Sequence, residues 1–450
     1  MSRVLVIGSG AREHAITHAL CNSGATVSCF ASNLNPGIMV LADDLEIGDL
    51  NSPDRVIDYA ARQKIDLAVI GPEAPLAAGV ADALRTESIP TVGPGRKLAQ
   101  IETSKAFARN LLTRNGIPGC PRYRTFDTLD GVADWLDELG DGYVVKYDGL
   151  AGGKGVKVAG DHLHSHTEAL DYCRELVTKG GCFVVEEKLI GEEFSLMSFC
   201  DGDTLYHMPA VQDHKRALDG DRGPNTGGMG SYSDATFSLP FLEHDDIRAA
   251  RAINEATAVA LREECSEPYR GFLYGGFIAT TSGPKLIEYN ARLGDPEALN
   301  VLEILQSDFV AICHSMATET LANCEVKFRP AATVCKYIVP EGYGAKPRLD
   351  CTLIINEEQL AASGASLYYA AVNQSPGGAL ETTSSRAVAV VGSGVTLAVA
   401  EAQCEAGIAA VNGRGLHVRH DIATPQLLEQ RVAHMRGLRS GHKTPAVMAA

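Results

Sequence analysis

The stretch from Glu288 to Glu297, with the sequence EYNARLGDPE, holds the residue types best suited to chemistry. It follows residues 284–287, where alternating side chains predict a strand. Glu288 and Asn290 are then expected on one face, and Arg292 continues the same parity. A carboxylate and an amide oxygen together suit a hard cation such as Mg²⁺, which leaves its other positions to phosphate. Arg292 would add a planar guanidinium for a carboxylate or phosphoryl group. By itself, so short a motif is more often a solvated strand end.

The composition indicates a multidomain protein that carries this stretch. At 450 residues the chain exceeds what one hydrophobic core usually supports, so about two to four domains with a cleft between them are expected. A net charge of −16 argues against nucleic-acid and anionic-membrane partners, because like charges repel. The twelve cysteines form no Cys-x-x-Cys pair. With no secretory leader or membrane span predicted, we expect a cytoplasmic protein with reduced thiols, as a monomer or weak dimer.

The N-terminal segment predicts the opening of a doubly wound α/β domain. A buried strand over 4–7 leads through a glycine turn into a helix that extends through Leu20. A dinucleotide fingerprint is incomplete, because Glu13 stands where the third glycine belongs and the second strand, 26–30, ends without an acid for ribose. The helix start, with free backbone N–H groups and Arg12, is instead a candidate phosphate site.

Two further residues of this region could face a ligand. The strand predicted at 67–70 runs into Glu73, which flanking prolines are expected to hold in a fixed, non-helical turn. Ligands of parallel sheets bind at such carboxyl ends of strands. A later helix contains Lys105 and ends near Gly116. Taken alone, Glu73 fits a structural turn equally well, and Lys105 fits a surface lysine.

A glycine-rich hairpin is predicted between strands at 143–146 and 156–158. Its residues Gly152, Gly153, Lys154 and Gly155 would let backbone N–H groups approach phosphate oxygens, and Lys146 would add positive charge. The spacing is not that of a Walker loop, and a strand rather than a helix follows. A hairpin without a ligand remains the alternative.

A short hinge is predicted after the next strand, 182–185. Backbone groups of Glu186, Glu187, Lys188 and Leu189 could read an adenine edge, and Glu193 could bind ribose hydroxyls. A charged connecting loop is the alternative.

The order of these features resembles the ATP-grasp superfamily: a lysine helix, a strand lysine before a glycine-rich hairpin, an acidic hinge and a late Glu-x-Asn strand. Five blocks narrow the resemblance to the phosphoribosylamine–glycine ligase family. They are GSGAREHA from residue 8, GPEAPL from residue 71, DHKR from residue 213, GPNTGGMG from residue 223 and RLGDPE from residue 292. The resemblance extends from the first strand to about residue 422.

The resemblance implies roles for the residues already singled out. ATP would lie against Lys105, Lys146, the glycine-rich hairpin and the hinge, with Glu193 at its ribose. Mg²⁺ or Mn²⁺ would bridge the phosphates at Glu288 and Asn290, and the catalytic residues would be Asp213, Lys215 and Arg292. The residues implied for phosphoribosylamine and glycine are Gly10, Arg12, Glu13, Glu73, Asp213, Lys215, Pro224, Asn225, Thr226, Gly227, Arg292, Gly294 and Asp295.

The implied reaction is ligation of glycine to 5-phosphoribosylamine through glycyl phosphate. It would consume ATP and give glycinamide ribonucleotide, ADP and phosphate in de novo purine biosynthesis. A carboxylate needs a leaving group before an amine can attack it, and phosphoryl transfer supplies one. Such chemistry depends on positioning and charge neutralisation, so no catalytic serine or cysteine is expected. The loop from Pro224 to Gly230 would close over the substrate.

The implied fold is α/β, with an N-terminal doubly wound parallel-sheet domain, a two-part ATP-grasp domain and a smaller C-terminal α/β domain. The expected boundaries are 1–102, 103–325 with a nucleotide-covering part at 123–192, 326–423, and a tail over 424–450. Strands are expected at 333–339 and 386–391 and a helix at 395–407. The tail has helix-like apolar spacing from Leu427 to Met435 and then reads as disorder.

Three departures and two alternatives stay open. Leu299 stands where many relatives carry Gln, Glu or Met, Tyr147 replaces a small residue, and Gly276 cannot supply a further metal ligand, so the number of bound ions is open. Another ATP-grasp ligase would lack the GPEAPL and GPNTGGMG blocks, which are present. A nicotinamide-dependent oxidoreductase or nucleotide-sensing module would need the absent third glycine and ribose-binding acid.

Overall fold

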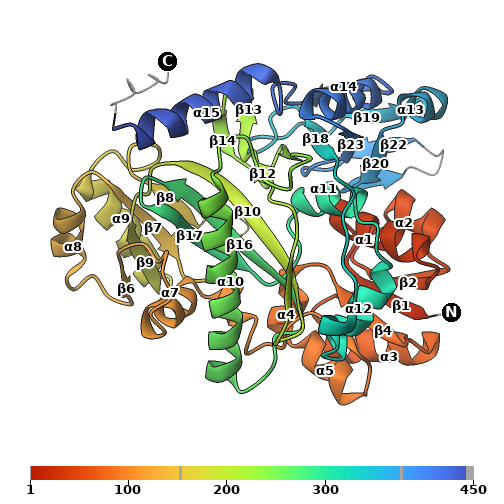
Figure 1. Cartoon of the computed structure of the whole chain (residues 1–450), viewed down its shortest axis with the longest axis horizontal. Coiled ribbons are helices and arrows are strands. Elements are labelled where there is room, and N and C mark those ends of the chain that lie inside the picture. The colour runs from red at the N-terminus through yellow and green to blue at the C-terminus, as the bar shows by residue number, and fades with distance from the viewer. Residues whose placement is uncertain (1, 152–154, 375–378, 442–450) are drawn as a thin grey trace.

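The computed structural model describes residues 2–151, 155–374 and 379–441 (Figure 1). Sheets are present in the red N-terminal part, the yellow part at the left of Figure 1, the green centre and the blue C-terminal part. Mixed helices and strands confirm the predicted α/β class. None of the described helices combines the length and apolar character that crossing a bilayer requires.

The N-terminal part is a five-stranded parallel sheet in the order β3-β2-β1-β4-β5, which confirms the doubly wound prediction. Its strands are β1 (Arg3–Ile7), β2 (Thr26–Ala31), β3 (Asp44–Ile47), β4 (Leu67–Ile70) and β5 (Thr91–Val92). Its helices are α1 (Ala11–Asn22), α2 (Pro36–Leu41), α3 (Pro53–Gln63), α4 (Glu73–Ala78) and α5 (Val80–Thr86). The strand order reverses between β1 and β4, so their carboxyl ends form the crevice where such sheets bind ligands.

The predicted non-helical turn at Glu73 is wrong. Glu73 is the first residue of α4, and Pro72 is its N-cap. Pro75 lies in the first turn, where a missing N–H removes no intrahelical hydrogen bond. The prolines therefore start a short helix here instead of preventing one.

The yellow part is a small four-stranded sheet in the order β6-β9-β7-β8. Helices α6 (Gln100–Thr103) and α7 (Lys105–Arg114) lead into it. Its elements are β6 (Tyr123–Phe126), α8 (Val132–Leu139), β7 (Tyr143–Tyr147), β8 (Val156–Val158), α9 (His166–Thr178) and β9 (Phe183–Glu187). Antiparallel pairing of β7 with β8 confirms the predicted hairpin. Its buried side chains form a cluster separate from the main core, so this part is an independently packed unit.

The central sheet has the order β11-β10-β16-β17 and carries the stretch at 288–297. Its strands are β10 (Glu192–Cys200), β11 (Leu205–His207), β16 (Gly271–Thr280) and β17 (Gly283–Asn290), and the long helix α10 (His244–Cys265) packs on it. Along β17, Leu286 pairs with Phe277 and Glu288 with Gly276, which leaves Ile287 as an extra, bulged residue. The strand was predicted, and the bulge was not.

The C-terminal part contains two sheets, in the orders β12-β15-β18-β23-β20 and β21-β22-β19-β24. The first sheet comprises β12 (Gln212–Asp213), β15 (Gly230–Ser233), β18 (Ala332–Pro340), β20 (Ser366–Tyr369) and β23 (Val388–Gly394), and β25 (Leu416–His417) pairs with β18. The second comprises β19 (Thr352–Ile355), β21 (Val372–Gln374), β22 (Leu380–Thr382) and β24 (Val411–Arg414). A hairpin of β13 (Arg216–Leu218) and β14 (Arg222–Asn225) stands beside them. The remaining helices are α11 (Glu297–Glu303), α12 (Phe309–Ala317), η1 (Leu321–Asn323), α13 (Glu357–Ser363), α14 (Leu397–Ile408) and α15 (Pro425–Arg439).

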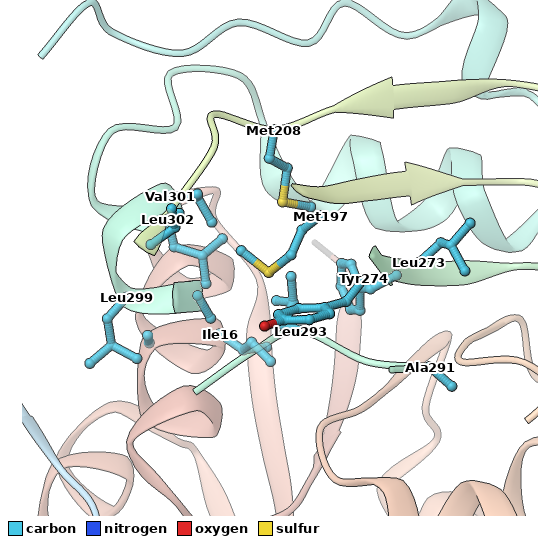
Figure 2. Close-up of a cluster of buried hydrophobic side chains, with 14 of the residues drawn as sticks. Ile16, Met197, Met208, Leu273, Tyr274, Ala291, Leu293, Leu299, Val301 and Leu302 are labelled. Carbon is cyan, nitrogen blue, oxygen red and sulfur yellow. The ribbon is translucent and has the colours of Figure 1, made fainter. Parts of the chain in front are cut away.

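A continuous hydrophobic core joins the N-terminal, central and C-terminal parts. Figure 2 shows Ile16 of α1, Met197 of β10 and Leu299 of α11 in one buried cluster. Leu299 is fully buried, so the departure at this position is accommodated by apolar packing. The three parts are therefore held as one body around the segments that follow β17.

His14 links the N-terminal and C-terminal parts, because its Nδ1 accepts the Tyr369 N–H at 3.0 Å. Burial, with the nearby charge of His18, lowers the pKa of His14 from 6.5 to about 3. The unfolded chain binds more protons between these values, so this contribution to stability is complete above pH 6.5 and falls as the pH drops toward 3. Each pH unit in that window should remove about 1.4 kcal/mol.

Urea denaturation of wild type and His14→Gln at several pH values tests this prediction. The stability advantage of wild type should shrink as the pH falls from 7.5 to 5, while the buried His214 contributes equally to both proteins. A stability difference that does not change with pH would show that folding does not lower the pKa of His14.

Candidate active site

The predicted site residues converge on one cleft of about 880 Å³ between the small sheet, the central sheet and the N- and C-terminal parts. The predicted residues that line it are Arg12, Glu73, Lys105, Lys146, Gly155, Glu186, Glu187, Lys188, Leu189, Glu193, Asp213, Lys215, Asn225, Thr226, Gly227, Glu288, Asn290, Arg292 and Asp295. Gly10, Glu13, Pro224 and Gly294 are described by the structure but are outside this lining. Gly152, Gly153 and Lys154 lie outside the described residues.

Glu288 and Asn290 both line the wall of this cleft. Burial would raise the pKa of Glu288, but Lys215, Lys105 and Lys146 outweigh it and hold the pKa below its usual range. The Asn290 Oδ1 accepts a hydrogen bond from Arg292 at 3.1 Å. Within the described residues no group of three or more His, Cys, Asp or Glu side chains could hold a metal ion. Two oxygen donors fit an ion such as Mg²⁺, which takes most of its ligands from water and phosphate.

Glu186 anchors the strand lysine instead of standing free at the hinge. Its carboxylate is buried and receives Arg109 at 2.7 and 3.0 Å and Lys146 at 2.8 Å. Although burial opposes ionisation, both cations hold the pKa of Glu186 below its usual range. Arg109 and Lys146 also donate to the carbonyl of the bulged Ile287, at 2.7 and 2.9 Å. The bulge therefore turns the Ile287 carbonyl toward Arg109 and Lys146. The hydrogen bond to this carbonyl helps to hold the Lys146 ammonium in the cleft.

Asp213 and Lys215 face the same region from β12 and the residues after it. Lys215 Nζ lies 3.4 Å from the Glu193 carboxylate. Burial and the neighbouring Glu297 raise the pKa of Asp213 well above its usual value. Its Oδ1 is buried and receives no hydrogen bond from the described residues. Asp213 is thus a carboxyl group suited to holding a proton beside the cleft.

Arg292 is held by two carboxylates, one of which the sequence did not indicate. It lies 3.1 Å from Glu102 and 3.6 Å from Glu73. Glu102 is buried at the end of α6, and it also accepts the Ala291 N–H at 2.7 Å. The predicted guanidinium is therefore fixed in direction by a paired acid on each side.

At the start of α1, the Glu13 carboxylate contacts both the Gly10 backbone and the Arg12 side chain. Glu13 Oε2 accepts the Gly10 N–H at 2.7 Å, and Glu13 Oε1 pairs with Arg12 at 2.6 Å. A Cβ at Gly71 would lie 2.2 Å from Glu13, so this glycine makes room for the carboxylate. The Gly10 N–H and the Arg12 guanidinium therefore both have a partner within the chain, and phosphate binding at this helix start stays a prediction.

The C-terminal part holds the loop from Pro224 to Gly230 through Arg386, which the sequence did not single out. Its guanidinium donates to the carbonyls of Gly227 at 2.6 Å and Asp295 at 3.0 Å. It also pairs with the Asp295 carboxylate at 3.0 Å and stacks 4.3 Å from the Tyr337 ring centre. One side chain therefore joins the loop to the turn after Arg292.

Replacing Arg386 with methionine should loosen this loop, because methionine supplies apolar volume but no donor. We expect kcat/KM to fall about 10²-fold, since small misplacements of this kind cost that much. Hydrogen exchange of the peptide over 222–229 should rise in parallel. Arg329→Met, at an exposed arginine bonded to Ser393 at 3.3 Å, is the matched control and should change neither quantity. Unchanged exchange in the Arg386 variant would contradict this role.

Comparison with known protein families identifies the family of this chain. Three models of phosphoribosylglycinamide synthetase match the chain: the N domain at residues 2–102, the ATP-grasp (A) domain at 103–298 and the C domain at 333–425. The chain belongs to the phosphoribosylglycinamide synthetase family. This result confirms both the predicted family resemblance and the ATP-grasp fold class.

Individual members of the synthetase family match over nearly the whole chain. The phosphoribosylamine–glycine ligase of Methanosarcina barkeri is 47% identical over 439 residues, which cover 97% of this chain and 100% of that protein. The ligase of Methanopyrus kandleri is 45% identical and covers 98% and 100%. The crystal structure of the Thermotoga maritima ligase superposes with a TM-score of 0.78 at 28% identity, covering 93% of this chain and 100% of that one. A biotin carboxylase from Campylobacter jejuni shares the fold, with a TM-score of 0.69 at 14% identity.

Proposed function

We propose that this synthetase joins glycine to 5-phosphoribosylamine at the expense of ATP, producing glycinamide ribonucleotide, ADP and phosphate for purine biosynthesis. Its full-length identity to phosphoribosylamine–glycine ligases supports this reaction. The observation that carries it is the meeting of Glu288 with three lysines, Lys105, Lys146 and Lys215, in one cleft. Such a site neutralises the charge of a polyphosphate and of its transferred group.

The nucleotide is proposed to lie between the small sheet and the central sheet. The hinge connects β9 to β10, and its residues Glu187, Lys188 and Leu189 line the cleft. Glu193, the second residue of β10, also lines the cleft. Glu288 and Asn290 would hold the divalent ion, for which Mg²⁺ and Mn²⁺ are both suitable hard cations. When bound, the ion would neutralise phosphate charge. A cytoplasmic setting is proposed from the composition.

The ligation proceeds in two substitutions. First, a carboxylate oxygen of glycine attacks the γ-phosphorus of ATP, and the bond to the leaving oxygen of ADP breaks. This step forms glycyl phosphate. Second, the amine nitrogen attacks the carbonyl carbon, the nitrogen loses a proton, and phosphate leaves with the bonding electron pair. The positions of Lys215 and Arg292 suit the stabilisation of charge that develops on the transferred phosphoryl and carbonyl oxygens.

Asp213 is proposed to take part in transferring the proton that the amine nitrogen loses in the second substitution. Its pKa is raised by burial and by Glu297, and its Oδ1 receives no hydrogen bond from the described residues, which suits a group that exchanges a proton with the substrate. Gly228 of the covering loop lies directly beside it, since a Cβ there would be 2.8 Å from the Asp213 Oδ1. Closing this loop would keep water from glycyl phosphate and from the unstable amine.

Glycine labelled with ¹⁸O in its carboxylate tests the proposal. One labelled oxygen should leave in inorganic phosphate and the other should remain in the amide. ADP release should also require each of the three substrates. Phosphate without label, or ADP release that continues unchanged without glycine, would overturn the proposed reaction.

A further inference from the structure

The C-terminal helix α15 reaches the cleft. Arg431 and His434 of this helix line it beside Gly191 and Glu192, at the end of the hinge. The helix packs against β10 and β16, and Figure 1 shows it at the top of the molecule above the small sheet. All but its first residue lies beyond the match to the family's C domain, which ends at residue 425. Its function is therefore not assigned by that match.

The contacts of α15 centre on the Glu192 carboxylate. His434 Nδ1 lies 2.6 Å from one oxygen of Glu192, and Arg431 Nη1 lies 3.3 Å from the other. Arg431 also pairs with Asp221, in the turn between β13 and β14. One arginine thus connects the hinge with the hairpin that leads into the covering loop.

Glu192 and Glu193 have opposite environments although they are neighbours. The Glu192 side chain is 7% exposed, whereas that of Glu193 is 53% exposed and faces Lys215. Successive side chains of a strand point to opposite faces, so fixing Glu192 also fixes the direction of Glu193. The backbone just before them is closely packed against β16, because a Cβ at Gly191 would lie 1.7 Å from the Ala279 carbonyl oxygen. Without Arg431 and His434, the Glu192 carboxylate would turn toward water, and the backbone of the hinge would move with it.

We propose that α15 is part of the nucleotide site, with Arg431 as a positioning residue that holds Glu192 and thereby sets the hinge and Glu193 against the adenosine part of ATP. This inference rests on the proposed function, which requires a nucleotide at the hinge. His434 is the second support of the same carboxylate.

Calorimetric binding of ADP with Mg²⁺ to the purified full chain tests the inference without relying on the ligation reaction. Arg431→Met should weaken binding at least about tenfold, because it removes the guanidinium partner of the buried Glu192 carboxylate. Adding Glu192→Gln to Arg431→Met should restore most of the affinity, because the amide does not need a cationic partner. Such non-additivity is expected only if Arg431 acts through Glu192.

Two controls lie on the same helix. Arg436 is exposed, and Arg436→Met should bind ADP like wild type. Arg439 pairs with Glu243 at 3.2 Å away from the hinge, so Arg439→Met weakens the docking of α15 without touching Glu192. Equal losses in the Arg439 and Arg431 variants, or wild-type affinity in Arg431→Met, would overturn the inference. Failure of wild type itself to bind ADP would overturn the proposed function as well.

Discussion

Glu288→Gln is expected to lower the turnover number at least about 10³-fold, because it removes the one carboxylate of the proposed ion site while keeping its shape. Glu288 lies among three lysines, and its pKa is held low by them, so it is ionised when substrates bind. The amide would retain an oxygen but lose the charge that attracts a divalent cation. Steady-state product formation over a range of Mg²⁺ concentrations measures the effect.

The thermal unfolding midpoint of Glu288→Gln should stay within a few degrees of wild type, so that lost turnover reports chemistry and not folding. Glu263→Gln, at an exposed position of α10, is the charge-matched control and should retain full activity. Turnover close to wild type in the Glu288 variant would show that the divalent ion is held elsewhere.

Arg292→Met is expected to abolish measurable ligation and also to destabilise the fold by about 3–5 kcal/mol. The second effect follows because Glu102 would be left buried without its cation, as breaking a buried pair does. Burial already raises the pKa of Glu102, with Arg292 opposing it. Without Arg292 the carboxyl would bind a proton more readily when folded, so the variant should recover stability as the pH falls. Urea denaturation at pH 7.5 and pH 5 measures both parts.

A double variant separates the two roles of Arg292. Glu102→Gln in the Arg292→Met background removes the stranded charge and keeps an acceptor for the Ala291 N–H. We expect stability to return toward wild type while ligation stays absent. Recovery of ligation together with stability would contradict a role for Arg292 in the chemistry.

Much of the scaffold followed from local patterns. Buried apolar runs predicted β1, β2 and β4, glycine spacing predicted the β7–β8 hairpin, and residue parity predicted that Glu288 and Asn290 share a wall of the cleft. These features depend on residues a few positions apart, so periodicity and turn chemistry are enough to predict them. Glu73 is the exception, because proline excludes most helix positions but not the first turn.

The partners of the charged groups depended on tertiary structure. Arg109 meets Glu186 from 77 positions away, Arg386 reaches Gly227 from 159, and His434 reaches Glu192 from 242. The bulge at Ile287 arises from the register of β17 against β16. Sequence alone predicted the family, the strands β1, β2 and β4 and the charged residues that line the cleft. Only packing of distant segments decided which acid holds which cation, because an ion pair depends on distance in space and carries no periodic signal along the chain.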